Sequence, residues 1–284
     1  MAKSSVVTKP RDILGNSALR PDGAHKVQGS FEFTSDLHAE NMLWGATLRS
    51  PHPYAKIMSI DTSAALALPG VHCVITADDV PGKSTYGLIS SDQPVFASDY
   101  VRYMGEPVAA VAADHPETCR RALSLITVVY GVLTPLTDPE DAIAGSFDPI
   151  HPDGNVIRHQ RIIRGDQTIT GAVVVEGEYV IGMQDQAFLG LEAALAVPDP
   201  DGLGLHLHVA TQWLHEDLTQ ISACLNMPAE KVRLTLGGVG GAFGAREDIS
   251  LQVHCCLLAL KAGRPIKMQY SREESFFGHV HRHP

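Results

Sequence analysis

The stretch that decides the fold of this 284-residue sequence reads Leu236-Gly237-Gly238-Val239-Gly240-Gly241-Ala242-Phe243-Gly244-Ala245-Arg246-Glu247-Asp248. Apolar and polar residues alternate just before it, which predicts a strand over 232–236. Apolar residues recur after it at spacings of three or four, which predicts a helix over 249–260 with Glu247 and Asp248 at its start. The sequence therefore predicts a strand, a glycine loop and a helix N-terminus in succession.

Five glycines fall between positions 237 and 244 of this stretch. Glycine has no Cβ, so its backbone can approach a ligand closely. A helix N-terminus offers unpaired N–H groups with partial positive charge. Together these features suit an oxyanion or a polar cofactor. The alternative is a tight turn between strand and helix, but the number of glycines around Phe243 favours a binding site.

The two common nucleotide-binding motifs fail in this loop at a defining residue. A dinucleotide motif that begins at Gly238 would need a third glycine where Phe243 stands. A phosphate loop would need Lys and Ser or Thr after Gly244, where Ala245 and Arg246 stand. An unrelated nucleotide-binding protein is therefore disfavoured.

The loop resembles instead the G-G-G-F-G-G-K-E segment in the molybdenum-cofactor subunit of the xanthine dehydrogenase/aldehyde oxidase family. Residues 240–247 read G-G-A-F-G-A-R-E and depart from the family pattern at Ala242, Ala245 and Arg246. Four further segments resemble the family in order and spacing, so the resemblance covers about residues 20 to 284. They are R-P-D-G-A-H-K-V-Q-G (20–29), L-R-S-P-H-P-Y-A-K-I (48–57), G-E-P-V-A (105–109) and Q-D-Q-A-F-L-G-L-E (184–192).

The resemblance implies a molybdenum–molybdopterin cofactor, either as the plain pterin or as its cytosine dinucleotide. It places Gln212, in A-T-Q-W, near the oxo ligand of the metal, with Phe243 also close to the metal. The cofactor-binding residues that it implies are Gln212, Gly240, Gly241, Ala242, Phe243 and Gly244. The alternative for Gln212 is a cap on the helix that the apolar spacing from Trp213 to Leu225 predicts.

Glu247 corresponds to a glutamate that binds purines in the xanthine-oxidising branch of the family. The resemblance therefore implies a purine or a related N-heterocycle as the small-molecule substrate, and a role in purine catabolism. The alternative for Glu247 is an acid in the first helical turn, where the helix dipole favours negative charge. Aldehyde-oxidising and carbon monoxide dehydrogenase types remain open.

The family's general base, a glutamate far downstream, is expected beyond Pro284, so no catalytic residue is assigned in this chain. We interpret the 284 residues as the N-terminal part of an oxidoreductase subunit that hydroxylates its substrate with oxygen from water. We expect the chain to be inactive alone. The alternative is an inactive, truncated module that serves assembly.

Composition and charge limit the partners. The net charge is −10 and the pI is about 5.7, and no basic stripe is present to neutralise phosphates, so nucleic acid is disfavoured. Neither an export signal nor a membrane span is recognised, and we expect a cytoplasmic protein.

The five cysteines lack a C-x-x-C pair and have apolar neighbours, which predicts buried, reduced thiols. The resemblance accordingly implies that 2Fe–2S and FAD groups reside on partner subunits in an oligomeric assembly.

His279, His281 and His283 form an H-x-H-x-H motif near the end of the chain. On a strand the three imidazoles would share one face and suit Zn or Ni. The alternative is a polar strand edge, which we favour because the sequence shows no carboxylate or cysteine nearby to complete a ligand set.

The organisation predicted is a mixed α/β (α+β) chain. It has a lead-in over 1–19, an α/β hammerhead domain over 20–137 as the resemblance implies, a linker over 138–155, and the first, incomplete molybdopterin-binding region over 156–284. Strands are predicted near 108–112, 128–130, 173–175, 193–197, 205–209 and 265–270, with a helix from about 114 to 126. An incomplete cofactor region would leave apolar surface uncovered, so we expect a partner-dependent monomer.

Overall fold

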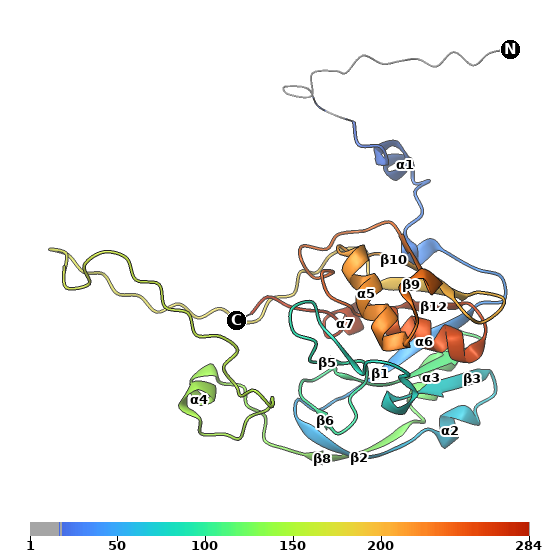
Figure 1. Cartoon of the computed structure of the whole chain (residues 1–284), viewed down its shortest axis with the longest axis horizontal. Helices are drawn as coiled ribbons and strands as arrows, with labels where there is room; N and C mark the ends of the chain where they lie inside the picture. Colours follow the sequence, from blue (N-terminus) through green and yellow to red (C-terminus); the bar gives the residue numbers. More distant parts are fainter. Residues whose placement is uncertain (1–16, 18, 284) are drawn as a thin grey trace.

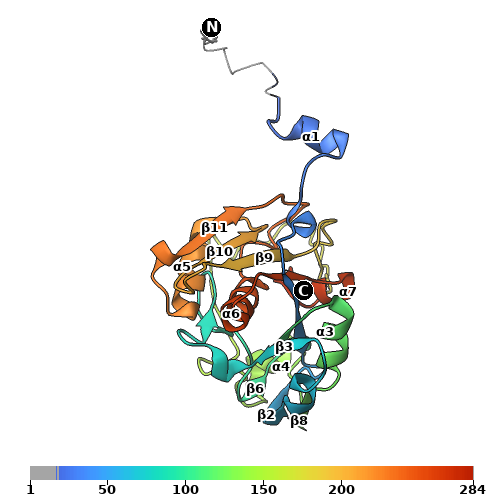
Figure 2. The same cartoon turned by 90° about the vertical axis from the view of Figure 1, so that its right-hand side faces the viewer.

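The computed structural model describes residue 17 and residues 19–283, so most of the predicted lead-in over 1–19 lies outside the described residues. The predicted mixed architecture is confirmed (Figures 1 and 2). The strands are β1 Leu43–Arg49, β2 Ala55–Asp61, β3 Val71–Ile75, β4 Thr85–Tyr86, β5 Gln93–Pro94, β6 Tyr100–Val101, β7 Pro107–Ala113, β8 Thr127–Val132, β9 Ala193–Pro198, β10 Leu205–Val209, β11 Val232–Leu236 and β12 Ile266–Gln269. The helices are α1 Gly23–Gln28, α2 Ser63–Leu66, α3 Pro116–Leu123, α4 Pro139–Ala144, α5 Leu214–Leu225, α6 Gln252–Ala262 and α7 Arg272–Ser275.

A seven-stranded sheet of order β11-β10-β9-β12-β1-β7-β3 runs through the structure. β1 lies between β12, to which it is parallel with Leu43 opposite Ile266, and β7, to which it is antiparallel. Strands from both predicted regions therefore share one sheet, and a smaller sheet of order β6-β2-β8 lies beside it. The exact domain boundaries stay predictions.

β7 shows why its sequence forms a central strand. Every residue of P-V-A-A-V-A-A is buried, and an unbroken apolar run is typical of a strand covered on both faces. α3 follows at once, because Pro116 fits the first helical turn and His115 Nδ1 accepts a hydrogen bond from the Glu117 backbone N–H at 3.1 Å. The predicted strand–helix succession over 108–126 is thus confirmed.

α6 fills the space between the sheet and the segments that cover it (Figure 2). Its residues from Gln252 to Ala259 are all buried, so it is a core helix rather than an amphipathic one. α5 packs beside α6. Each of the five cysteines is buried and free, as the sequence predicts.

Three predicted elements differ from the structure. The helix after the glycine loop begins at Gln252, not at Glu247 and Asp248, because side chains bond the backbone just before it. The N–H of Ile249 donates to its neighbour Asp248 Oδ1 at 2.9 Å, and the N–H of Ser250 donates to Gln252 Oε1 at 2.8 Å. Such local bonds compete with a helical turn.

The strand predicted over 173–175 is absent from the described structure. These valines lie in an irregular, exposed segment that extends away from the body of the molecule (Figure 1). The predicted linker over 138–155 contains α4, since Asp138 Oδ1 accepts the Glu140 N–H at 2.8 Å. His279, His281 and His283 lie on no strand, although Arg282 forms an isolated bridge to Gln184.

Among the described residues, none of the helices has the length and apolarity needed to cross a membrane.

Glu106 makes the fold sensitive to pH. It is 1% exposed, and burial raises the pKa of its carboxyl from 4.5 to about 7. The folded chain therefore holds this proton more tightly than the unfolded chain. The resulting stability is present below about pH 4.5 and is lost as the pH rises to about 7. Relative to Glu106→Gln, we expect the unfolding free energy of the wild type to fall by about 2 to 3 kcal/mol between pH 4.5 and 8.

Urea unfolding of both proteins at several pH values measures this difference. Burial also raises the pKa of the Asp217 carboxyl and lowers the pKa of the His254 imidazole. Both groups are present in the wild type and in the variant, so their contributions cancel in the difference. Parallel pH curves would show that Glu106 is ionised in the folded chain at neutral pH.

Candidate functional site

The glycine loop leaves β11 at the edge of the large sheet. β11 pairs in parallel with β10, and the Gly237 N–H extends this pairing by donating to the Val209 carbonyl at 2.7 Å. The carbonyl of Gly240 then accepts a hydrogen bond from the Gly190 N–H at 3.0 Å. Residues 237–240 are thus fixed against two other segments of the chain.

Four glycines in this loop, the first of them Gly237 beside the Thr34 side chain, have neighbours too close to admit a Cβ. A Cβ on Gly238 would lie 2.3 Å from the Phe31 ring, and a Cβ on Gly240 would lie 2.8 Å from the Gly190 Cα. Gly241 has φ +111°, and its Cβ would lie 2.9 Å from the Phe188 Cβ. A cavity of about 230 Å³ lies behind the loop and reaches Gly238, Gly240 and Arg246.

The other side of the loop is a turn that faces outward. Phe243 has φ +54° and Gly244 has φ +91°, and the Ala245 N–H closes the turn on the Ala242 carbonyl at 3.0 Å. The Phe243 side chain is 77% exposed, whereas Ala242 and Ala245 are buried. In the part of the chain that the structure describes, the backbone N–H groups of residues 241–244 donate no hydrogen bond.

Gln212 lies against this loop. Its backbone N–H donates to the Arg246 carbonyl at 2.9 Å, and its side-chain Oε1 accepts the Arg246 N–H at 3.3 Å. The interpretation of Gln212 as a helix cap is wrong, since Trp213 occupies the N-cap of α5 and the Gln212 side chain bonds Arg246 instead. The structure therefore joins Gln212 to the glycine loop.

Arg246 is a residue of the site that sequence reasoning treated only as a departure from the family pattern. It is 4% exposed, and its guanidinium lies 4.4 Å from the centre of the Phe188 ring. Nη2 donates to the Gly190 carbonyl, and burial lowers the pKa of the guanidinium. No sequence signal singles it out, because Arg246 stands beside Glu247 and Asp248 in a run of charged residues. Arg246 connects the loop, Gln212 and the 188–190 segment.

Glu247 follows Arg246 and is half-buried. A Cβ on Gly244 would lie 3.9 Å from Glu247 Oε1, so the carboxylate lies beside the outward turn. The interpretation as a first-turn acid is wrong, because α6 begins only at Gln252 and has no acid in its first turn. The structure thus brings together Gln212, Phe243 and Glu247 around one loop.

The donor set at this loop fits a group with many acceptor atoms. At the outward turn, backbone N–H groups with no partner among the described residues, together with the absence of a Cβ at Gly241 and Gly244, suit an oxyanion or a polar ring system. The Gln212 amide adds a side chain with both donor and acceptor atoms. The loop can bind and orient such a group without ligating a metal directly.

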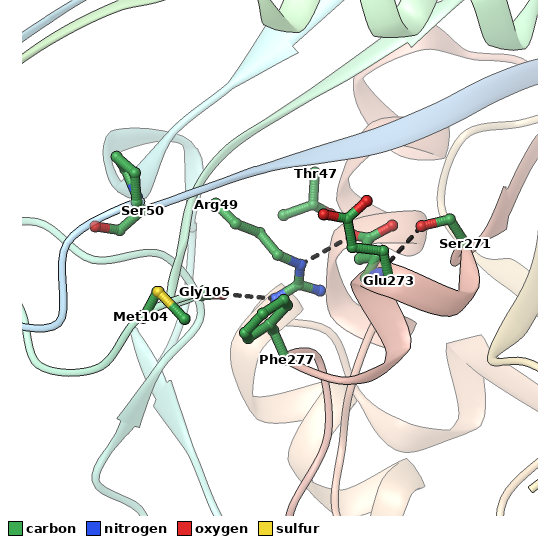
Figure 3. Close-up of a pocket in the computed structure, with 10 residues that line it drawn as sticks. Thr47, Arg49, Ser50, Met104, Gly105, Ser271, Glu273 and Phe277 are labelled. Carbon is green, nitrogen blue, oxygen red and sulfur yellow. Dashed lines mark hydrogen bonds and ion pairs between the residues drawn. The ribbon is translucent and has the colours of Figure 1, made fainter. Parts of the chain in front are cut away.

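A second cavity, of about 390 Å³, shares no lining residue with the loop (Figure 3). Arg49, from the 48–57 segment, dominates it: Nε donates to Glu274 Oε1 at 3.0 Å and Nη1 donates to the Gly105 carbonyl at 2.9 Å. Burial raises the pKa of the Glu274 carboxyl, which the pairing with Arg49 opposes. Ser271 caps α7 by accepting the Glu274 N–H at 3.0 Å. Arg49 therefore ties the end of β1 to α7, a structural contact between the two predicted regions.

Two family models match the chain. The family described as "Aldehyde oxidase and xanthine dehydrogenase, a/b hammerhead domain" matches residues 28–134. The family described as "Molybdopterin cofactor-binding domain" matches residues 150–284, which include Gln212 and the whole glycine loop.

Similar proteins agree with these matches. The chain is 36% identical over 282 residues to a probable xanthine dehydrogenase subunit of Bacillus subtilis, covering 98% of this chain and 37% of that protein. It is 34% identical over 279 residues to the nicotinate dehydrogenase large molybdopterin subunit of Eubacterium barkeri, covering 97% of this chain and 65% of that protein. The solved aldehyde oxidoreductase of Desulfovibrio gigas superposes with a TM-score of 0.84 at 27% identity, over 93% of this chain and 31% of that one. The chain thus spans between about a third and two thirds of the length of these relatives.

Proposed function

We propose that this chain, which belongs to the xanthine dehydrogenase and aldehyde oxidase family of molybdenum hydroxylases, holds a molybdenum–pterin cofactor at its glycine loop. The observation that carries the proposal is the outward turn over 241–244. Among the described residues its backbone N–H groups have no partner, and Gly241 and Gly244 have positive φ angles that a side chain would strain. When bound, the group supplies the redox chemistry of a hydroxylation that takes its oxygen from water. The chain itself binds and orients it.

In this proposal Gln212 and Phe243 lie nearest the metal, and the backbone of Gly240, Gly241, Ala242 and Gly244 lines the pterin. The two hydrogen bonds between Gln212 and Arg246 fix the amide relative to the turn. A positioned amide beside a metal centre acts through hydrogen bonds to the metal's other ligands rather than as a ligand. Whether the pterin carries a cytosine nucleotide is decided by phosphate and base analysis of the extracted cofactor.

For the substrate we propose a purine or a related N-heterocycle, held by Glu247 beside the turn. A carboxylate accepts hydrogen bonds from ring N–H groups, and a half-buried one does so with less competition from water. The names of two relatives support a heterocycle, since they refer to xanthine and to nicotinate. An aldehyde is the alternative, supported by the Desulfovibrio gigas enzyme.

The substitution Glu247→Val in the assembled enzyme tests this assignment. We expect kcat/KM for a purine such as hypoxanthine to fall by about 100-fold, the loss of roughly 3 kcal/mol typical of a hydrogen bond to a charged group. Turnover of an aromatic aldehyde should change little. Steady-state kinetics with both substrates measures the ratio, and Glu230→Gln, at an exposed site, is the matched control.

An equal loss for both substrates would place Glu247 in the support of the cofactor. No loss for either would remove it from the site.

Three further roles belong to other parts of the assembly. We propose that the general base lies in the part of the relatives' length that these residues do not match, so that the 284-residue chain alone does not turn over substrate. We propose that 2Fe–2S and FAD groups on partner subunits accept the electrons, in a cytoplasmic enzyme of purine breakdown. Exposed apolar side chains between 156 and 183, such as Ile157, Val173 and Tyr179, support a chain that depends on partners.

A further inference from the structure

Two histidines and one aspartate converge at a point outside the glycine loop. His279 Nε2 lies 2.8 Å from Asp185 Oδ2, and His281 Nε2 lies 3.1 Å from the same oxygen. These three atoms all lie within 4.8 Å of one another. Each is buried, and none makes a hydrogen bond of acceptable geometry within the described chain. The three atoms therefore lie together around a shared space.

The backbone holds the aspartate in this position. Gln184 and Arg282 pair through two backbone hydrogen bonds of 3.4 and 3.1 Å, which brings their neighbours Asp185 and His281 side by side. The other carboxylate oxygen, Asp185 Oδ1, accepts the Ala187 N–H at 2.6 Å. Ala187 has φ +46°, an uncommon conformation for a residue with a side chain. Asp185 is thus fixed so that only Oδ2 faces the histidines.

Glu192 orients the buried histidine. The His279 side chain is 1% exposed, and its Nδ1 lies 2.6 Å from Glu192 Oε1. A carboxylate on Nδ1 fixes the proton there and leaves Nε2 as the free donor of an electron pair, an arrangement found around metal-bound histidines. The His279 ring stacks on the His281 ring, with 4.8 Å between their centres and 23° between their planes.

We propose that Asp185, His279 and His281 bind one divalent first-row transition cation, with Glu192 orienting His279 and water completing the coordination. Two imidazoles and one carboxylate on one side of an ion, with the remaining positions open, suit Fe²⁺, Co²⁺ or Zn²⁺. The sequence shows only the two histidines, since Asp185 comes from a distant segment. His283 is exposed and lies outside the group.

This cation site is separate from the proposed cofactor loop, but Phe188 contacts both. The Phe188 ring centre lies 5.1 Å from that of His279 and 4.4 Å from the Arg246 guanidinium. An ion bound at the site would cross-link the 184–192 segment to the 279–282 segment. It would thereby fix one wall of the loop.

Cobalt binding to the untagged full chain, stripped of metal with a chelator, tests the proposal. We expect one Co²⁺ per chain, detected by its visible d–d absorption. Zn²⁺ should displace the Co²⁺ and so remove this absorption. Asp185→Asn and His281→Asn should each weaken Co²⁺ binding by at least about 100-fold, and Glu192→Gln by about 10- to 100-fold. His283→Asn is the matched control, because it removes a histidine of the same motif outside the group, and it should bind as the wild type does.

Circular dichroism shows whether each variant is folded. His281→Asn changes a side chain that is 15% exposed, so this variant decides the test if Asp185→Asn does not fold. A folded wild-type chain that takes up neither Co²⁺ nor Zn²⁺ would overturn the proposal and leave a buried ion pair. Equal loss in His283→Asn would overturn it too, because binding would then belong to exposed histidines.

Discussion

Replacing Gly241 with alanine is expected to remove most of the molybdenum and pterin from the assembled protein. The backbone of Gly241 has φ +111°, which an L-residue adopts at a cost of about 1 to 3 kcal/mol. The added Cβ would also lie 2.9 Å from the Phe188 Cβ, so the loop or the 188–190 segment must move. Either movement displaces the N–H groups that we assign to the cofactor. Metal analysis of the purified variant measures the loss, which we expect to exceed about 10-fold.

Gly145→Ala is the matched control for this substitution. Gly145 also has a positive φ, +70°, but no atom lies within 4 Å of an added Cβ there. We expect a loss of about 1 kcal/mol in stability and an unchanged molybdenum content. Equal molybdenum content in both variants and the wild type would show that the turn over 241–244 does not hold the cofactor.

Arg246→Ala is expected to have the second largest effect. It leaves the half-buried Gly190 carbonyl without its donor and removes the guanidinium from the Phe188 ring. We expect a loss of about 3 kcal/mol in unfolding free energy, from the unpaired carbonyl and the lost packing together. The cofactor content should fall with it, since the guanidinium holds the loop against the 188–190 segment. Urea unfolding and metal analysis measure the two effects.

Two variants separate the roles of charge and geometry in this prediction. Arg246→Lys keeps the positive charge and introduces the lysine of the family pattern, but it has no planar fork, so we expect about half of the loss. Arg233→Ala, at an exposed position of β11, should change stability by less than about 0.5 kcal/mol. An Arg246→Ala protein as stable as the wild type would contradict the role of the guanidinium as the connection between the loop, Phe188 and Gly190.

The sequence predicted the strands and the helix that border the site because their periodicity is a local property. The alternation of 232–236 and the unbroken apolar run in 107–113 each fix a strand without reference to distant residues. The start of α6 was mispredicted because the Asp248 and Gln252 side chains bond the backbone and delay the helix. The valines at 173–175 form no strand because they have no sheet partner within the described residues.

The contacts within the site join residues that are far apart in the sequence. Local sequence patterns do not predict such contacts. Nothing in the order of residues shows that Arg246 lies over Phe188, or that Asp185 completes the group around His279. The role of the loop and the importance of Gln212 came from the family resemblance rather than from spacing. The geometry of the loop came from the structure, in which the Gln212 side chain bonds Arg246 and therefore does not cap α5.

The molybdenum and pterin content of the purified protein, assembled with its electron-transfer partners, decides whether the glycine loop holds the cofactor. Metal analysis and pterin fluorescence of the same sample give both values per chain. We expect about one molybdenum and one pterin per chain in the wild type, both lost in Gly241→Ala and both retained in Gly145→Ala. A folded, assembled wild-type protein that contains neither would contradict this expectation, and would leave Gln212, Phe243 and Glu247 with structural roles only.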